Sequence, residues 1–138
     1  MSEVITKIEK VSIPQGEYEA VCLSYNTYNF RGQKKVCLIW EVDIEGCSVL
    51  LEQHFNVSHS YFKDTTKYYT SYTIVNQKRP ERREFKRMSP KMFVGAHCLV
   101  TVVNAKPKFK SGKLKPDSMS YSLIDEIIDY IGRCDNAA

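Results

Sequence analysis

The sequence predicts a mainly β protein: a five-stranded antiparallel barrel, with a helix between its third and fourth strands and a second helix at its C-terminus. Three observations support this prediction. A chain of 138 residues, 43% of them hydrophobic, has the size and composition of one globular domain, expected to span residues 1–138. Its first half repeats short strand-like runs separated by turn signals. Two later segments instead place apolar residues at helical spacing.

The first three strands follow from residues 17–57. Residues 17–24 alternate between polar and apolar side chains, which is the period of a half-buried strand. Residues 25–33 combine Asn, Gly and Arg with three aromatic residues and are predicted to be turn-like. Residues 34–44 are rich in β-branched and aromatic residues, and the dipeptide Glu45–Gly46 separates them from a similar run. Short connections of this kind predict an antiparallel meander.

The period of the pattern changes after the third strand and predicts a helix over residues 58–75. A polar, basic arm bounded by prolines follows, over about residues 76–91. Residues 98–103 form a strongly β-forming run, and about residues 104–116 resemble a basic hairpin with a glycine at its turn. Within residues 58–75, the residues at helical spacing are Tyr61, Thr65, Tyr68, Tyr72 and Val75.

The second helix is predicted over about residues 121–132. Ser122 is its expected N-cap, with Asp125 three residues later, and Gly132 is expected to end it. Its apolar stripe consists of Leu123, Ile124, Ile127, Ile128 and Ile131.

This order of elements is the order found in an OB-fold, a small five-stranded barrel. Another small α+β or β-barrel fold with the same number of elements is the alternative. The sequence contains no internal repeat and no low-complexity tract.

The cysteines and the hydropathy pattern restrict where the protein works. Five cysteines make an odd number, without a CxxC pair, and the charged N-terminus does not resemble a secretory signal. We therefore expect a cytoplasmic protein with reduced thiols. No run approaches the roughly 18 apolar residues that a membrane helix needs, so a membrane partner is not expected.

The charges are unevenly distributed along a chain whose net charge is only +4. Residues 61–91 hold nine Lys or Arg against three Asp or Glu, and residues 106–115 hold five lysines and no acid. The rest of the chain therefore has a net charge of −7. This asymmetry favours a surface for a polyanion, and two solvated loops are the alternative interpretation.

The sequence offers little for catalysis. His97 and Cys98 are neighbours on a predicted strand, so they should point to opposite faces and cannot form a base–nucleophile pair. Cys98 is instead expected in the core. His54 and His59 lack the spacing of zinc ligands and have no paired cysteine. We predict no catalytic residue, no metal ligand and no cofactor.

An acidic strand face is the remaining candidate for metal-dependent chemistry. Glu41, Asp43 and Glu45 share this face, but no lysine follows at the spacing of metal-dependent nucleases, so a solvated face is the expected role. No glycine-rich phosphate-binding motif is present either.

Aromatic and basic residues alternate in several segments, as they do in proteins that bind single-stranded nucleic acid by stacking on bases and tracking phosphates. Trp40, Tyr68 and Tyr72 are expected in the core, whereas Phe85 and Phe109 are flanked by charges and are expected to contact a ligand. The predicted nucleic-acid-binding residues are Tyr28, Phe30, Arg31, Lys34, Lys35, Tyr61, Lys63, Lys67, Arg79, Arg82, Arg83, Phe85, Lys86, Arg87, Lys106, Lys108, Phe109, Lys110 and Lys113.

Three motifs carry a family resemblance: residues 87–95 (RMSPKMFVG), Tyr121-Ser122-x-Ile124 and Gly16-Glu17-Tyr18. They resemble small OB-fold proteins of phages, plasmids and other mobile elements, which are regarded as single-stranded DNA-binding or replication accessory proteins. The resemblance spans most of residues 13–131 and implies a barrel whose loops grip single-stranded DNA. Residues 134–138 (CDNAA) do not resemble the long acidic tail with an aromatic tip by which housekeeping single-strand binders recruit partners, so that recruiting role is not expected.

The function expected from these observations is non-enzymatic binding of single-stranded DNA with little sequence preference. The host process would be replication or recombination of a mobile element, and a replication or recombination protein of that element would be the second partner. The alternatives are a protein-binding module or inhibitor that uses the basic face, and RNA binding. The sequence leaves the oligomeric state open.

Overall fold

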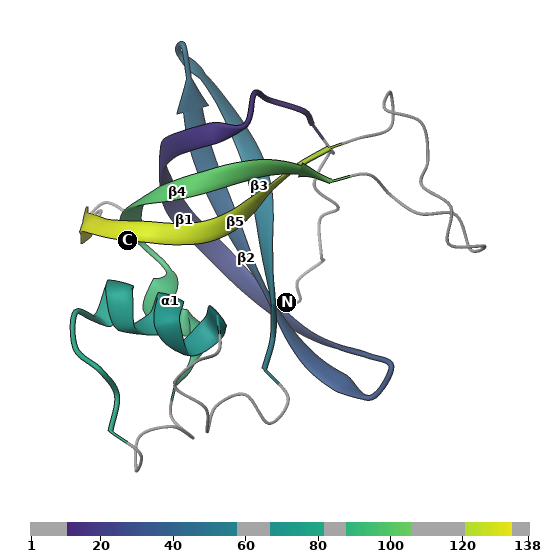
Figure 1. Ribbon diagram of the computed structural model, residues 1–138, viewed down its shortest axis with the longest axis vertical. Helices are drawn as coiled ribbons and strands as arrows, with labels where there is room; N and C mark the ends of the chain where they lie inside the picture. The colour runs from purple at the N-terminus through teal and green to yellow at the C-terminus, as the bar shows by residue number, and fades with distance from the viewer. Residues whose placement is uncertain (1–10, 58–66, 82–87, 106–120, 134–138) are drawn as a thin grey trace.

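The computed structural model describes residues 11–57, 67–81, 88–105 and 121–133 (Figure 1). Within them lie five strands, one α-helix and a short 3₁₀ helix. All strands belong to one antiparallel sheet in the order β3-β2-β1-β4-β5, and no ladder among the described residues joins β3 to β5, so the sheet is not closed. The elements are β1 (Gly16–Phe30), β2 (Gln33–Ile44), β3 (Cys47–Asn56), α1 (Lys67–Asn76), η3 (Pro90–Phe93), β4 (Ala96–Ala105) and β5 (Tyr121–Arg133).

Two-residue turns join the first three strands and confirm the predicted meander. Arg31 and Gly32 have φ of 52° and 77°, and Glu45 and Gly46 have φ of 50° and 86°. Positive φ at both central residues is typical of a type I′ hairpin turn, for which a glycine at the second position is favourable. The turn predicted at Glu45–Gly46 is confirmed.

The prediction of a turn-like segment over residues 25–33 is largely wrong. β1 continues through it to Phe30, and only Arg31 and Gly32 leave the strand. The tyrosines, threonine and phenylalanine of this stretch favour a pleated strand, and the paired β2 supplies the hydrogen bonds. A β-bulge at Leu23 shifts the register between β1 and β2. This shift explains why the alternation of polar and apolar residues stops near residue 24 although the strand continues.

The predicted C-terminal helix is wrong, because residues 121–133 form β5 and pair with β4. The ladder skips Asp125, Ile128 and Ile131, so every third residue is a bulge. The inward-facing residues of β5 therefore recur every three positions, as Ile124, Ile127 and Tyr130 opposite the inward residues of β4. A strand with this spacing imitates the apolar period of a helix.

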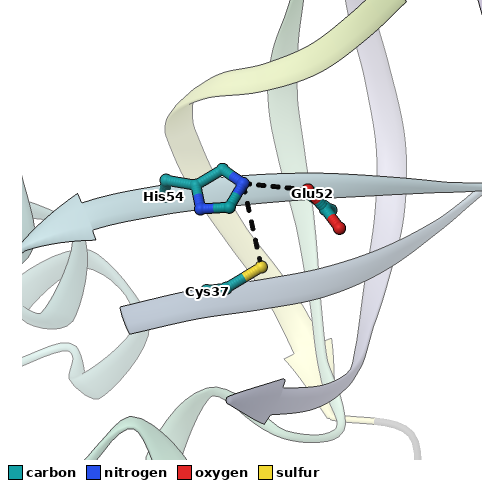
Figure 2. Close-up of side chains that lie close together, drawn as sticks. All are labelled: Cys37, Glu52 and His54. Carbon is teal, nitrogen blue, oxygen red and sulfur yellow. Dashed lines mark hydrogen bonds and ion pairs between the residues drawn. The ribbon is translucent and has the colours of Figure 1, made fainter. Parts of the chain in front are cut away.

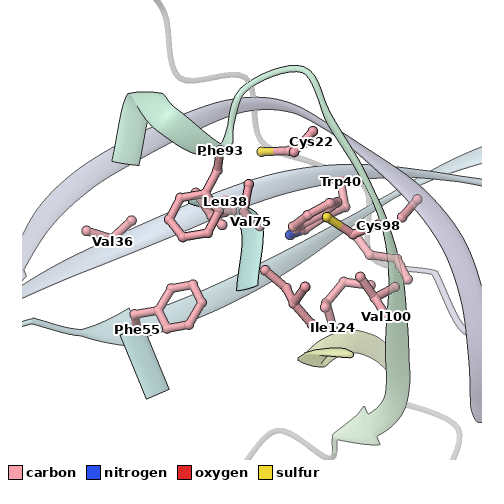
Figure 3. Close-up of a cluster of buried hydrophobic side chains, with 14 of the residues drawn as sticks. Cys22, Val36, Leu38, Trp40, Phe55, Val75, Phe93, Cys98, Val100 and Ile124 are labelled. Carbon is pink, nitrogen blue, oxygen red and sulfur yellow. The ribbon is translucent and has the colours of Figure 1, made fainter. Parts of the chain in front are cut away.

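The helix predicted over residues 58–75 is confirmed for its second half, since α1 spans Lys67–Asn76. Its residues 58–66 lie outside the described part of the chain. Tyr68 and Val75 are buried, and Tyr68 packs edge-on against Phe55 with ring centroids 5.5 Å apart. Trp40 and Cys98 are fully buried, as predicted, in the same core (Figure 3). Among the described residues, no helix is long and apolar enough to cross a membrane.

The predicted basic arm over residues 76–91 is anchored at both ends. The hydroxyl of Tyr69 donates to the carbonyl of Pro80 (3.2 Å), and that of Tyr68 donates to the carbonyl of Met88 (2.6 Å). Met88 and Pro90 are buried, and η3 begins at Pro90, so the end of this segment packs against the body of the protein. Residues 82–87 lie outside the described residues.

Gln53 connects β3 and β5, the two edge strands of the sheet. Its side chain, only 1% exposed, accepts a hydrogen bond from the indole N–H of Trp40 (3.0 Å). Its amide nitrogen donates to the backbone carbonyl of Asp125 on β5 (3.4 Å). A buried side-chain bridge therefore stands where a backbone ladder would close the sheet.

Candidate nucleic-acid interface

The β1–β2 hairpin projects from the body of the protein and ends in the turn Arg31–Gly32 (Figure 1). Residues 27–34 are all exposed, whereas residues 36–40 of β2 are all buried. The two strands pair in register up to Phe30 and Gln33, so the projecting part has a defined backbone. This end of the molecule presents its side chains to solvent on a regular hairpin.

Five of the predicted binding residues meet on this hairpin, and we call them the hairpin end. Phe30 is 53% exposed, and the guanidinium carbon of Arg31 lies 5.1 Å from the centre of its ring. Tyr28 is 38% exposed and stands opposite Lys35 in the β1–β2 ladder. Exposed aromatic rings beside cations are the two elements with which single-strand binders contact bases and phosphates. The hairpin end comprises Tyr28, Phe30, Arg31, Lys34 and Lys35.

Polar contacts fix Tyr28 against the neighbouring strands. Its hydroxyl lies 3.0 Å from Nδ1 of His54 on β3, and the two rings meet edge to face. Burial raises the pKa of the Tyr28 hydroxyl, and the nearby Cys37 and Glu52 raise it further, so the group stays neutral and able to hydrogen-bond. The tyrosine ring is thus held on the outer face of β2.

Below Tyr28, three potential metal ligands lie together on β2 and β3 (Figure 2). Nε2 of His54 is 2.9 Å from a carboxylate oxygen of Glu52 and 4.0 Å from the sulfur of Cys37. The three ligand atoms lie within 4.8 Å of one another. Burial raises the pKa of the Cys37 thiol to about 12, and Glu52 adds to the shift.

The opposite end of β1 has the opposite charge. A pocket there is lined by carboxylates from β1 and β2, and His97 of β4 forms an ion pair with Glu19 at 3.0 Å. Because anionic side chains repel phosphates, this region is unsuited to a nucleic-acid backbone. We call the acidic residues of this pocket, Glu17, Glu19, Glu41 and Asp43, the acidic end.

Two further predicted binding residues lie apart from the hairpin end. The ammonium of Lys67, at the start of α1, pairs with Asp125 of β5 at 2.7 Å. Arg79 is exposed in the segment after α1, and Figure 1 shows α1 well apart from the hairpin tip. The remaining predicted residues lie outside the described part of the chain: Tyr61, Lys63, Arg82, Arg83, Phe85, Lys86, Arg87, Lys106, Lys108, Phe109, Lys110 and Lys113.

Sequence reasoning missed the cluster of Cys37, Glu52 and His54, although a signal for it was present. The turn at Glu45–Gly46 fixes the register of β2 and β3, in which the numbers of paired residues sum to 91. Cys37 therefore stands opposite His54, and Glu52 shares their face because it lies two residues away. Ligand spacing along the chain cannot reveal a cluster formed across a ladder.

Comparison of the chain with protein-family models, with curated proteins and with solved structures found no match. The functional argument therefore depends on the geometry described above.

Proposed function

We propose that this protein binds single-stranded DNA without catalysis and with little sequence preference, through the hairpin end. The observation that carries this proposal is the exposed Phe30 ring with the Arg31 guanidinium over it. Phe30 is not part of the hydrophobic core, and a half-exposed ring on a regular hairpin is a suitable platform for an unstacked base. The cations of Arg31, Lys34 and Lys35 are then within reach of the adjoining phosphates.

The strand order supports an OB-fold as the finer description of this sheet. An OB-fold is a five-stranded, partly open barrel that binds oligonucleotides on its second and third strands and on the loops after its first and fourth strands. Here α1 lies between β3 and β4 in the chain. The edge strands of the sheet are β3 and β5, and a ladder between them would close it into a barrel. The hairpin end occupies the first of these loops, and Tyr28 and His54 lie on the adjoining strand face.

The second loop is the β4–β5 connection, residues 106–120, which lies outside the described residues. Its sequence contains five lysines and Phe109 between two of them. We propose that it completes the interface. The resemblance to OB-fold proteins of mobile elements supports replication or recombination of such an element as the process, and a protein of that process as a further partner.

Equilibrium binding to labelled single-stranded DNA, duplex DNA and RNA of equal length tests the proposal. Each oligonucleotide should be longer than about 16 nucleotides, the upper end of the length that one OB-fold covers. We expect the tightest binding to single-stranded DNA, and weaker binding in the variant Arg31→Ala/Lys34→Ala/Lys35→Ala. The matched control, Glu17→Gln/Glu19→Gln/Asp43→Asn, changes three charges at the acidic end and should not weaken binding.

Each other outcome favours a different function. Tighter binding to RNA would favour an RNA-binding protein. Binding to none of the three nucleic acids would contradict the proposal and favour a protein-binding module that uses its basic face. Cleavage of the labelled strands in the presence of Mg²⁺ would contradict the absence of catalysis.

A further inference from the structure

We propose that Cys37, Glu52 and His54 form a zinc-binding site on the outer face of β2 and β3. Their side chains converge from two adjacent strands, and Figure 2 shows one imidazole nitrogen of His54 facing both the thiol of Cys37 and the carboxylate of Glu52. The site does not depend on nucleic-acid binding. It contradicts the expectation, drawn from spacing along the chain, that the protein has no metal ligand.

The three donors are the types that zinc prefers in proteins. Zinc binds cysteine sulfur at about 2.3 Å, histidine nitrogen at about 2.0–2.1 Å and carboxylate oxygen at about 2.0–2.2 Å. Two such ligands in a tetrahedral arrangement are about 3.3–3.6 Å apart. Nε2 of His54 lies 2.9 Å from Glu52 and 4.0 Å from Cys37, so each of these two separations needs a shift of about half an ångström. The ligand atoms of Cys37 and Glu52 lie within 4.8 Å of each other and would draw together around the ion.

Burial and access also suit a metal. Cys37 is buried although it lies on the same outer face, whereas the side chains of Glu52 and His54 are each about one-third exposed. The sulfur would bind from below, and the imidazole and carboxylate from the sides. The solvent side is left for a fourth ligand, which is water in zinc sites with three protein ligands.

Tyr28 orients the histidine for this role. If Nε2 of His54 binds the metal, its proton must be on Nδ1, and Nδ1 faces the hydroxyl oxygen of Tyr28 at 3.0 Å. Metal-binding histidines almost always donate their second ring N–H to such an acceptor, which fixes the tautomer and the ring plane. The contact also couples the metal to an aromatic residue of the hairpin end.

A second histidine–carboxylate pair provides the contrast. His97 and Glu19 are 3.0 Å apart on the same sheet, on β4 and β1. Other carboxylates line the same pocket, but among the described residues no third ligand atom lies within 4.8 Å of both, as it does in the cluster of Cys37, Glu52 and His54. An ordinary surface ion pair therefore explains His97 and Glu19, but it does not explain a buried thiol directed at an imidazole.

The test is a titration of the full-length, metal-free, reduced protein with Zn²⁺ in competition with a chromophoric chelator. A parallel titration uses Co²⁺, whose absorption reports thiolate coordination and tetrahedral geometry. Both are carried out in a Cys47→Ser/Cys134→Ser background, so that Cys37 is the most accessible thiol among the described residues. We expect one equivalent of metal and a cobalt–thiolate band.

Single variants locate the site. Loss of a residue that hydrogen-bonds a metal ligand typically weakens metal affinity by about 10–100-fold, and we expect a loss of this size for Tyr28→Phe. Loss of a ligand itself should weaken Zn²⁺ affinity further, in Cys37→Ser, His54→Ala and Glu52→Gln. His97→Ala should bind Zn²⁺ as the parent does. Zn²⁺ should also raise the melting temperature of the parent and not that of His54→Ala.

Several results would overturn the proposal. Absence of stoichiometric binding would do so, and so would a Zn²⁺ affinity that survives His54→Ala, which changes an exposed side chain and should fold. If Cys37→Ser fails to fold, the cobalt spectrum of the parent decides, because a spectrum without a thiolate band excludes Cys37 as a ligand.

Discussion

The two ends of β1 lie on one strand and have opposite surface chemistry. Its start contributes Glu17 and Glu19 to the acidic end, and its last residues contribute Tyr28 and Phe30 to the hairpin end. From Glu19 to Tyr28 the strand covers about 30 Å of contour, several times the about 8 Å over which physiological salt screens charge. The net charge of +4 therefore describes neither end, and a polyanion should meet only the hairpin end.

The two ends also differ in how they relate to the core. At the acidic end, the inner face of the same strands buries Ala20, Val42 and Cys98. The hairpin end extends beyond this core, and residues 27–34 are exposed. Substitutions there should change ligand binding without changing stability, so effects on binding can be measured without effects on folding.

Removing the cations of the hairpin end should have the largest effect. Each phosphate contact to a single strand adds about 0.7 to the slope of log affinity against log salt, which is about a fivefold gain at 0.1 M salt. The variant Arg31→Ala/Lys34→Ala/Lys35→Ala should therefore lose about 100-fold in affinity and reduce the slope by about 2. Fluorescence anisotropy over a series of salt concentrations measures both quantities.

The acidic end supplies the reference for that result. Glu17→Gln/Glu19→Gln/Asp43→Asn should leave the salt slope unchanged and tighten binding only slightly. Equal losses of affinity in the two triple variants would show that the ends do not act separately, and the comparison would fail.

Phe30→Ala should have the next largest effect on binding. Loss of one stacked base costs about 1–3 kcal/mol, and the loss should persist at high salt because stacking releases no counterions. The melting temperature should not change, since the ring is half exposed. Ile131→Ala on β5 removes a comparably exposed apolar side chain and should bind normally. Affinity measured at low and at high salt checks this, and a loss confined to low salt would exclude stacking.

Gln53→Leu should separate folding from binding. Replacing the amide leaves the indole N–H of Trp40 and the carbonyl of Asp125 without their partner in the structure, at a cost of about 1–3 kcal/mol in the free energy of unfolding. Because this bridge lies in the core, DNA affinity per folded molecule should not change. Urea denaturation gives the stability, and an unchanged midpoint would mean that the bridge between β3 and β5 contributes nothing.

Parts of the fold could be predicted from the sequence because they are encoded locally. The turn at Glu45–Gly46 and the period of α1 are of this kind. β5 is not, because its bulges at Asp125, Ile128 and Ile131 arise only when the strand pairs with β4. A period of three in isolation resembles a helix. The local signal against a helix was the four isoleucines of the segment, since β-branched residues favour strands.

The candidate site shows the same division. Composition identified the aromatic and basic residues of the hairpin end, although it assigned Tyr28, Phe30 and Arg31 to a turn. It also grouped Lys67 with them, which instead pairs with Asp125 across the molecule. The cluster around His54 can be predicted only from the register of β2 and β3, which follows from the position of the turn at Glu45–Gly46. Residue types taken in order along the chain do not reveal it.

The smallest difference between the two ends is expected in their buried thiols. Cys37 lies beneath the hairpin end, and Cys98 lies beneath the acidic end, where its neighbours His97 and Leu99 line the pocket. Burial raises the pKa of each thiol to about 12. At pH 8 the reactive thiolate fraction is therefore about 10³-fold below that of an ordinary cysteine, and it should rise tenfold per pH unit up to that pKa.

Alkylation of the metal-free protein with iodoacetamide, followed by peptide mapping, measures these rates. Exposed Cys47 should react first, and Cys37 and Cys98 should react slowly and at similar rates. A chelator is needed because bound zinc would hold Cys37 as a thiolate and alter its rate. If Cys37 reacts as fast as Cys47 while Cys98 stays protected, the sheet opens at the hairpin end. The difference between the two ends would then be one of local stability as well as charge, and losses of binding in hairpin variants would have to be separated from that opening.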